Sequence, residues 1–207
     1  MNKQSVLLAA LSLAALVPSH AQTMDRPTYK VGDAWVYINE NALTHLRSAD
    51  SRFRIAEARP DGYRVIGGTQ TAPNITWDID GATLAVDKGN VIAYEKPEMQ
   101  WPLAVGRKWQ TVSTVKRVDG ITASRKYDVQ VETYEDVQTP AGTFKAFKVK
   151  TTGWHQFDKS DANGNNRGYT DRTDWWSPEV GRPVKTELRD GGPQDRTIRT
   201  LQSFTRN

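Results

Sequence analysis

Cysteine is absent from the 207-residue chain, and outside residues 1–21 the only histidines are His45 and His155. Without thiols the chain forms no disulfide framework, thiol nucleophile, Cys-ligated zinc site or iron–sulfur cluster. The two histidines lack the spacing of a histidine-based metal motif. The Gly-x-Ser-x-Gly nucleophile elbow and the phosphate-binding Gly-x-x-x-x-Gly-Lys loop are missing as well. We therefore expect no metal and no cofactor, and the motifs assign no catalytic residue.

The charge pattern argues against a nucleic-acid partner. Twenty-eight Lys and Arg residues face 24 Asp and Glu, which gives a net charge of +4. The basic residues are spread along the chain rather than gathered in one arm or tail, which favours a solvated surface of mixed charge. Hydrophobic residues at 37% and charged residues at 25% are typical of a folded globular protein.

Residues 1–21 have the three parts of a secretory signal peptide. Lys3 supplies the positive charge, Val6 to Val17 is an apolar stretch, and Ser19-His20-Ala21 is a small-x-small cleavage site. The stretch is short for a membrane anchor, and a short buried helix would not explain the order of the parts. We expect cleavage after Ala21, a periplasmic or secreted chain of residues 22–207, and no membrane span.

The rest of the sequence is typical of antiparallel β-structure. Short segments rich in Val, Ile, Thr, Tyr and Trp alternate with Gly, Pro, Asn and Asp, and nothing after residue 22 has a clear helical pattern. Phe147 and Val149 alternate with Lys148 and Lys150, as in a half-buried strand. Hairpin turns are predicted at Arg59–Gly62, Asp87–Asn90, Asp119–Gly120 and Thr139–Gly142.

One segment gives a mixed signal. Trp109, Val112, Val115 and Val118 recur every three residues, which resembles a helical face. The β-branched residues of this segment are poor helix formers and good strand formers, so we predict a strand.

We expect an all-β fold with one or more curved antiparallel sheets, arranged as a sandwich or half-barrel, in a single domain of residues 22–207. Val31-Gly32 recurs as Val105-Gly106, each followed by Trp three residues after the glycine, and partly as Val180-Gly181. Two similar β-rich halves, about 27–104 and 105–207, would explain this recurrence. Chance recurrence of a turn motif explains it equally well.

Four motifs, taken in order, carry a family resemblance: residues 32–37, 101–109, 139–144 and 175–181. With them the chain resembles exported bacterial TapB-like proteins of the domain-of-unknown-function type, over roughly residues 27 to 206. The resemblance implies a β-rich envelope protein of unassigned role. The resemblance assigns no catalytic residues to this sequence.

Tryptophan is the surplus in this composition, with seven residues. Trp154, Trp175 and Trp176 lie in the last third of the chain and are candidates for facing a ligand. Trp175 and Trp176, if in a strand, point to opposite faces, so one can be core while the other meets solvent, a second layer or a ligand. Core packing is the alternative for most of these side chains.

Two further sequence patterns are weaker evidence for a functional site. The segment from Asp158 to Gly168 is rich in oxygen-bearing side chains, which could bind a cation. No glycine stands at position six counted from Asp158 or Asp161, and no glutamate ends the segment, as the twelve-residue calcium loop requires, so a solvated hairpin loop is the better interpretation. Carboxylate pairs for glycoside chemistry could come from Asp78, Asp80, Glu132, Glu135 or Asp174.

Three functions follow, in order of preference. The first is a non-enzymatic periplasmic β-domain that binds an envelope lipid, glycan or protein. The second is an adaptor that docks on an envelope complex, and the third is a carboxylate-dependent hydrolase. A deep apolar groove would separate the first from the second, and convergent acids with a raised pKa would favour the third.

Overall fold

The computed structural model describes residues 22–160, 166–190 and 196–207. Strands are its only regular secondary structure, and none of these residues forms a helix long and apolar enough to cross a membrane. The predicted signal peptide, residues 1–21, lies outside the described residues. The strands are β1 (Thr23–Met24), β2 (Ala34–Asn41), β3 (Arg47–Arg59), β4 (Gly62–Gly67), β5 (Ile75–Asp78), β6 (Thr83–Val86), β7 (Val91–Lys96), β8 (Leu103–Ala104), β9 (Lys108–Lys116), β10 (Thr122–Thr139), β11 (Gly142–Phe157), β12 (Arg167–Trp176), β13 (Pro183–Asp190) and β14 (Arg196–Thr205).

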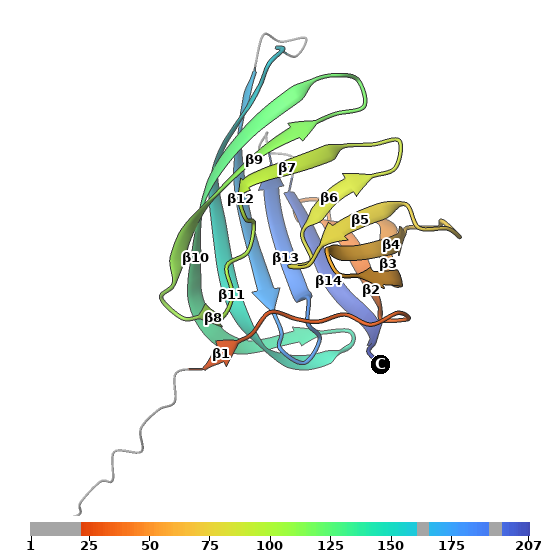
Figure 1. The fold of residues 1–207 in the computed structure, drawn as a ribbon. Helices are drawn as coiled ribbons and strands as arrows, with labels where there is room; N and C mark the ends of the chain where they lie inside the picture. The colour runs from red at the N-terminus through yellow and green to blue at the C-terminus, as the bar shows by residue number, and fades with distance from the viewer. Residues whose placement is uncertain (1–21, 161–165, 191–195) are drawn as a thin grey trace, which may run out of the picture.

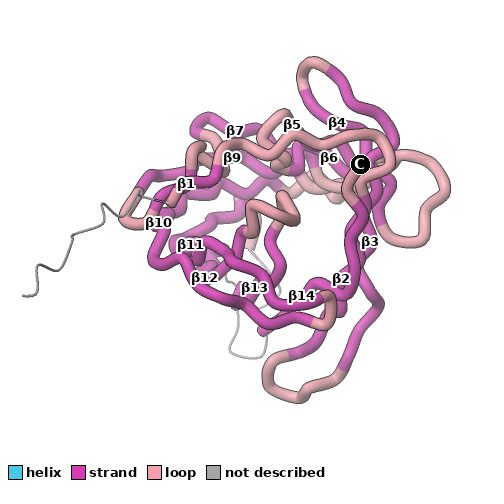
Figure 2. Tube along the Cα trace, turned by 90° about the horizontal axis from the view of Figure 1, so that it is seen from below, coloured by secondary structure: helices cyan, strands magenta, loops and turns pink. Residues whose placement is uncertain are grey.

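The strands form a closed antiparallel barrel (Figure 1). From β2 to β7 and from β9 to β14, each strand pairs with the next along the chain, β7 pairs directly with β9, and β14 pairs with β2 to close the ring. Seen from below, β10 to β14 and then β2 and β3 follow one another round this ring (Figure 2). The prediction of an all-β antiparallel fold is confirmed, and the curved sheet closes on itself.

Local sequence explains where the strands begin and end. Each predicted hairpin turn connects consecutive strands, because turn-forming residues stand between segments of β-branched and aromatic residues. The ambiguous segment after Trp109 is strand β9, paired with β10 from Lys116 to Lys108. Strand propensity therefore outweighed the three-residue spacing of its valines.

The recurring glycine motif forms the same turn twice. Gly32 and Gly106 have φ angles of 95° and 89°, a region that glycine occupies without strain. The Gly32 amide donates to the Ile55 carbonyl, and the Gly106 amide donates to the Val131 carbonyl, both at 2.9 Å. Strand β2 or β9 follows directly, and β1 pairs with β8 outside the barrel. The duplication of residues 27–104 and 105–207 stays a prediction, since a shared turn does not test it.

One end of the barrel, called here the packed end, holds the hydrophobic core. The segment after β1 crosses this end, and the hairpin of β10 and β11 runs along it (Figure 1). Tyr29 from the crossing segment packs edge-on against Trp35 and Tyr63. A second buried cluster surrounds Phe147 and Trp176, so the packed end is filled by large side chains on both sides of the barrel.

Candidate functional site

The interior of the barrel changes from packed to hollow along the strands. On β13, Val184 is 0% exposed, whereas Thr186 and Leu188 on the same inward face are half-buried. On β14, Leu201 is 0% exposed, whereas the inward-facing Arg199 is half-buried. Water therefore reaches the inner wall beyond the packed end. The end of the barrel opposite the packed end is called here the hollow end.

A cavity of about 240 Å³ occupies this part of the barrel and is called here the polar cavity. Strand alternation explains its lining: Arg172 and Asp174 of β12 lie opposite Leu188 and Thr186 of β13, so all four side chains share the inner face. The lining also includes Arg182 from the turn before β13, Arg199 from β14, and Glu98 from the segment between β7 and β8.

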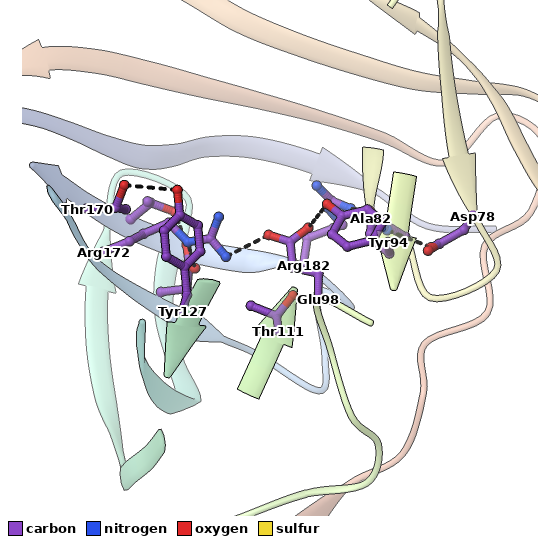
Figure 3. Close-up of polar contacts among 12 residues, drawn as sticks. Asp78, Ala82, Tyr94, Glu98, Thr111, Tyr127, Thr170, Arg172 and Arg182 are labelled. Carbon is purple, nitrogen blue, oxygen red and sulfur yellow. Dashed lines mark hydrogen bonds and ion pairs between the residues drawn. The ribbon is translucent and has the colours of Figure 1, made fainter. Parts of the chain in front are cut away.

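Arg172 is the centre of an internal ion-pair chain. Its Nη2 donates to Glu98 Oε1 at 2.7 Å (Figure 3). Its Nε lies 2.7 Å from Asp174 Oδ2. Tyr94 donates its hydroxyl to Glu98 Oε2 at 2.9 Å, and Thr186 donates to Asp174 Oδ1 at 2.7 Å. Every residue of this ion-pair chain thus has a polar partner, as buried charges require.

The ion-pair chain around Arg172 keeps Glu98 ionised. Burial opposes the charged carboxylate, but the Arg172 guanidinium and the Tyr94 hydroxyl outweigh burial, and the pKa of Glu98 lies below its usual value. The pKa of Tyr94 is raised, by burial first and by the Glu98 charge second, so Tyr94 remains a neutral hydrogen-bond donor. Glu98 is therefore unsuited to donate a proton as a general acid at neutral pH.

Arg182 lies at the floor of the polar cavity without a carboxylate within ion-pair distance among the described residues. Its guanidinium stacks 4.1 Å from the centre of the Trp77 ring and 5.8 Å from that of Trp176. Its Nη1 donates to the Gly81 carbonyl at 3.0 Å. It also hydrogen-bonds the Tyr29 and Tyr37 hydroxyls, so the side chain is held in place by stacking and by uncharged hydrogen-bond partners, not by an ion pair.

Arg199, like Arg182, has no ion-pair partner among the described residues. Its Nε donates to Asn39 Oδ1 at 3.2 Å, and no acid in the described part of the chain forms an ion pair with it. Burial lowers the pKa of Arg199; Tyr37 and Asp174 raise it in part, and the positive charges of Arg182 and Arg172 lower it further. The guanidinium stays protonated, since an arginine pKa lies far above neutral pH, but its surroundings disfavour the charge.

A smaller cavity of about 50 Å³ adjoins the polar cavity and shares Glu98 and Arg172 with it. Its wall includes Arg125, whose buried Nε has no hydrogen-bond partner, and Tyr127, whose hydroxyl lies 3.2 Å from that of Thr170 (Figure 3). Arg125 forms no ion pair with any described residue either. The two cavities together face four arginines but only two carboxylates, Glu98 and Asp174.

The acids proposed for glycoside chemistry do not converge. Asp78 and Asp80 share one turn, where the backbone amides of Asp80 and Ala82 donate to Asp78 Oδ1. The pKa of Asp78 is raised by burial, but this carboxylate serves as a turn cap. Glu132 pairs with Lys148 at 2.9 Å, and Glu135 accepts from the Trp175 indole at 2.8 Å, whereas Asp174 faces the cavity.

The predicted ligand-facing tryptophans occupy three different settings. Trp175 and Trp176 are on opposite faces of β12, as expected, and both are buried, at 7% and 6% exposed. Lys185 lies over the Trp175 ring, and Trp176 packs in the core beside Phe147. Trp154 is 56% exposed and contacts Tyr169 and Arg167. A ligand contact for these side chains stays a prediction.

Two other expectations concern cations. Residues 161–165 of the loop Asp158–Gly168 lie outside the described residues, so a cation there is also left as a prediction. Elsewhere in the described chain, no three His, Asp or Glu side chains gather as a metal site requires.

Of the residues that line the polar cavity, sequence reasoning named only Asp174, as a carboxylate for glycoside chemistry, and missed Glu98 and the arginines. In β12, Arg172 and Asp174 lie on the same face as the buried Trp176. Charged residues on the core-facing side of a strand could have indicated a polar interior site. Arg182 and Glu98 lie in irregular segments, whose direction no periodicity reveals.

A sequence model of the DUF3108-like family matches residues 88–194, just over half of the chain. The chain belongs to this family. The match includes Glu98, Arg125, Arg172, Asp174 and Arg182, so most of the arginines around the two cavities belong to the family region. The broader resemblance to a domain-of-unknown-function family is confirmed, and the narrower one to TapB-like proteins stays a prediction.

Two solved structures have a similar fold. A candidate lipoprotein from Parabacteroides distasonis is 14% identical and has a TM-score of 0.53, with 88% of this chain and 99% of that chain covered. A candidate exported protein with a YmcC-like fold from Bacteroides fragilis is 14% identical, with a TM-score of 0.52 over 88% of this chain and 100% of that chain. No curated protein matches the sequence. At this identity the likeness concerns the fold alone.

Proposed function

We propose that this protein is an exported, non-enzymatic binding protein of the bacterial envelope, and that its ligand occupies the polar cavity. The cavity is the observation that carries the proposal: half-buried Thr186, Leu188 and Arg199 line a hollow directly beyond the filled core. Rigid strands position these side chains, which is how binding sites hold their geometry. The signal-peptide pattern of residues 1–21 and the descriptions of the two similar structures support export.

The chemistry of the lining narrows the ligand class. An acyl chain needs an apolar tunnel, but the apolar end of this barrel is filled by side chains such as Trp35 and Trp77, each 1% exposed. The remaining space is lined mainly by charged side chains and threonines. A polar molecule, or the polar end of a glycan, suits this lining better than a lipid tail.

The same contacts favour binding over hydrolysis. A carboxylate hydrolase needs one acid that keeps its proton near neutral pH, close to a second that is ionised. Here Glu98 and Asp174 both contact Arg172, and the pKa of Glu98 is lowered. Their shared role is to hold Arg172 in place.

Native mass spectrometry of protein purified from the periplasm tests the proposal. Leu188→Trp fills the cavity, whereas Glu187→Trp adds the same bulk to the outer face of β13. We expect a non-covalent adduct on the wild type and on Glu187→Trp, and none on Leu188→Trp. An adduct that survives Leu188→Trp, or a wild type that carries none after incubation with periplasmic extract, would contradict the proposal.

A further inference from the structure

We propose that the polar cavity recognises an oxyanion, a carboxylate or phosphate group, which binds between the guanidinium groups of Arg182 and Arg199. This inference rests on the proposed function and names the chemical group that the cavity selects. It starts from a difference among the arginines. Arg172 is neutralised by Glu98 and Asp174, whereas Arg182 and Arg199 line the same cavity without an acidic partner in the described chain.

Glu98 and Asp174 pair with Arg172 and act on Arg182 and Arg199 only from beyond ion-pair distance, and the side chains closer to Arg182 are phenols. The phenols of Tyr29 and Tyr37 lie near Arg182, but burial raises the pKa of Tyr37 to about 12 and raises that of Tyr29 as well. Both are therefore neutral at physiological pH, and the Tyr29 hydroxyl donates to the Gly181 carbonyl at 2.9 Å. Two guanidinium charges in one partly dehydrated cavity repel each other, and a bound anion would relieve that cost.

The two arginines are also prepared for such a ligand. One nitrogen of each is anchored, Arg182 Nη1 by the Gly81 carbonyl and Arg199 Nε by the Asn39 side chain. Arg182 also hydrogen-bonds the Tyr29 and Tyr37 hydroxyls, which leaves fewer of its N–H groups for a ligand than Arg199 has. Arginine forks match carboxylate and phosphate oxygens in pairs, and prior anchoring reduces the entropy lost on binding.

The acids of the cavity do not make it a cation site. Glu98 accepts from Arg172 and Tyr94, and Asp174 accepts from Thr186 and lies against Arg172. A cationic ligand would have to displace Arg172 from both carboxylates and would meet Arg182 and Arg199 beside them. Hydroxyls of Thr83, Thr186 and Thr197 on the same wall can bond the neutral part of an acidic ligand.

Titration calorimetry at constant ionic strength provides the test, with inorganic phosphate, glucuronate and glucose as probes. We expect phosphate or glucuronate to bind the wild type, and the stronger of the two identifies the source as a phosphate or a sugar acid. Glucose, a neutral sugar of similar size to glucuronate, should not bind. Arg199→Gln and Arg182→Gln should each weaken anion binding by about tenfold or more, as expected for the loss of a charge-assisted bidentate contact.

Two controls separate recognition from folding. Arg189→Gln removes a charge from the exposed outer face of β13 and should bind the anion as the wild type does. The ligand-free melting temperature of Arg199→Gln should equal or exceed that of the wild type, because an unpaired buried charge is removed, while the stabilisation by added anion disappears. A variant that melts earlier and still binds the anion would show a structural role and overturn the inference.

The remaining outcomes distinguish this inference from the proposed function. A neutral adduct that Leu188→Trp excludes, together with no anion binding by the wild type, would overturn the oxyanion and keep the cavity as a binding site. Anion binding that Arg182→Gln and Arg199→Gln leave unchanged would also overturn the inference. Loss of both the adduct and anion binding would overturn both.

Discussion

The packed end and the hollow end of the barrel are made by the same strands but differ in chemistry. On β10, Val131 and Val129 are buried at the packed end, and Tyr127 and Arg125 follow on the same face toward the hollow end. On β14, Leu201 and Arg199 show the same change within two residues. Alternation along a strand thus decides which side chains face inward, and position along the strand decides whether they meet a core or a cavity.

The largest effect should come from the packed end. Phe147→Ala removes a side chain that is 0% exposed and packs with Trp176, and should lower the free energy of unfolding by about 3–5 kcal/mol by opening a cavity. Lys148→Ala, on the other face, breaks only a half-exposed pair with Glu132 and should stay within about 0.5 kcal/mol. Denaturant unfolding measures both. If Lys148→Ala proved the more damaging, the two faces of β11 would be wrongly assigned.

Two leucines compare the ends directly. Leu201→Ala, at the packed end, should cost about 2–5 kcal/mol, because Leu201 is 0% exposed. Leu188→Ala, on the wall of the polar cavity, should cost about 1 kcal/mol or less, since water already reaches that side chain. Thermal and urea unfolding of the two variants provide the measurement. Equal losses would mean that the hollow end is packed in solution.

The ion-pair chain should make the hollow end sensitive to acid. Glu98→Gln should lower the free energy of unfolding by about 1–3 kcal/mol at pH 7 through loss of charged hydrogen bonds. Because the folded-state pKa of Glu98 lies below its usual value of 4.5, its contribution is complete above that pH and is lost as the pH falls through the folded pKa. The difference between wild type and variant should therefore shrink in acid. A difference independent of pH would contradict the ionised assignment.

The hairpin along the packed end tests backbone strain without a change of packing. Gly142 has a φ angle of 134°, and a β-carbon there would meet only ordinary contacts, at 3.7 Å from Phe144. Gly142→Val should therefore cost about 1–3 kcal/mol through backbone conformation alone. Ala141→Val at the neighbouring position serves as the comparison, and unfolding curves measure both. A cost no greater for Gly142→Val would show that its backbone relaxes freely.

Several parts of the fold follow from short-range sequence signals. The hairpin at Asp119–Gly120 connects β9 and β10, and Phe147 and Val149 face inward opposite Lys148 and Lys150, as their alternation predicts. Turn propensity and strand period act over a few residues, so one sequence is enough to find them. Trp175 shows the limit: alternation placed it opposite Trp176, but only the hairpin of β10 and β11 explains why it is buried.

The sequence by itself determined the strand composition, the turns, the alternation of faces and the exclusion of cysteine chemistry. Only the tertiary structure decided that the sheet closes into a barrel and that Glu98, Arg172, Arg182 and Arg199 face one cavity. These four residues come from strands and loops that are up to about a hundred positions apart, since Glu98 precedes Arg199 by that distance. Closure depends on the pairing of β14 with β2, a long-range contact that no local sequence pattern predicts. Which arginines lack an ion pair is likewise known only when the positions of the neighbouring side chains are known.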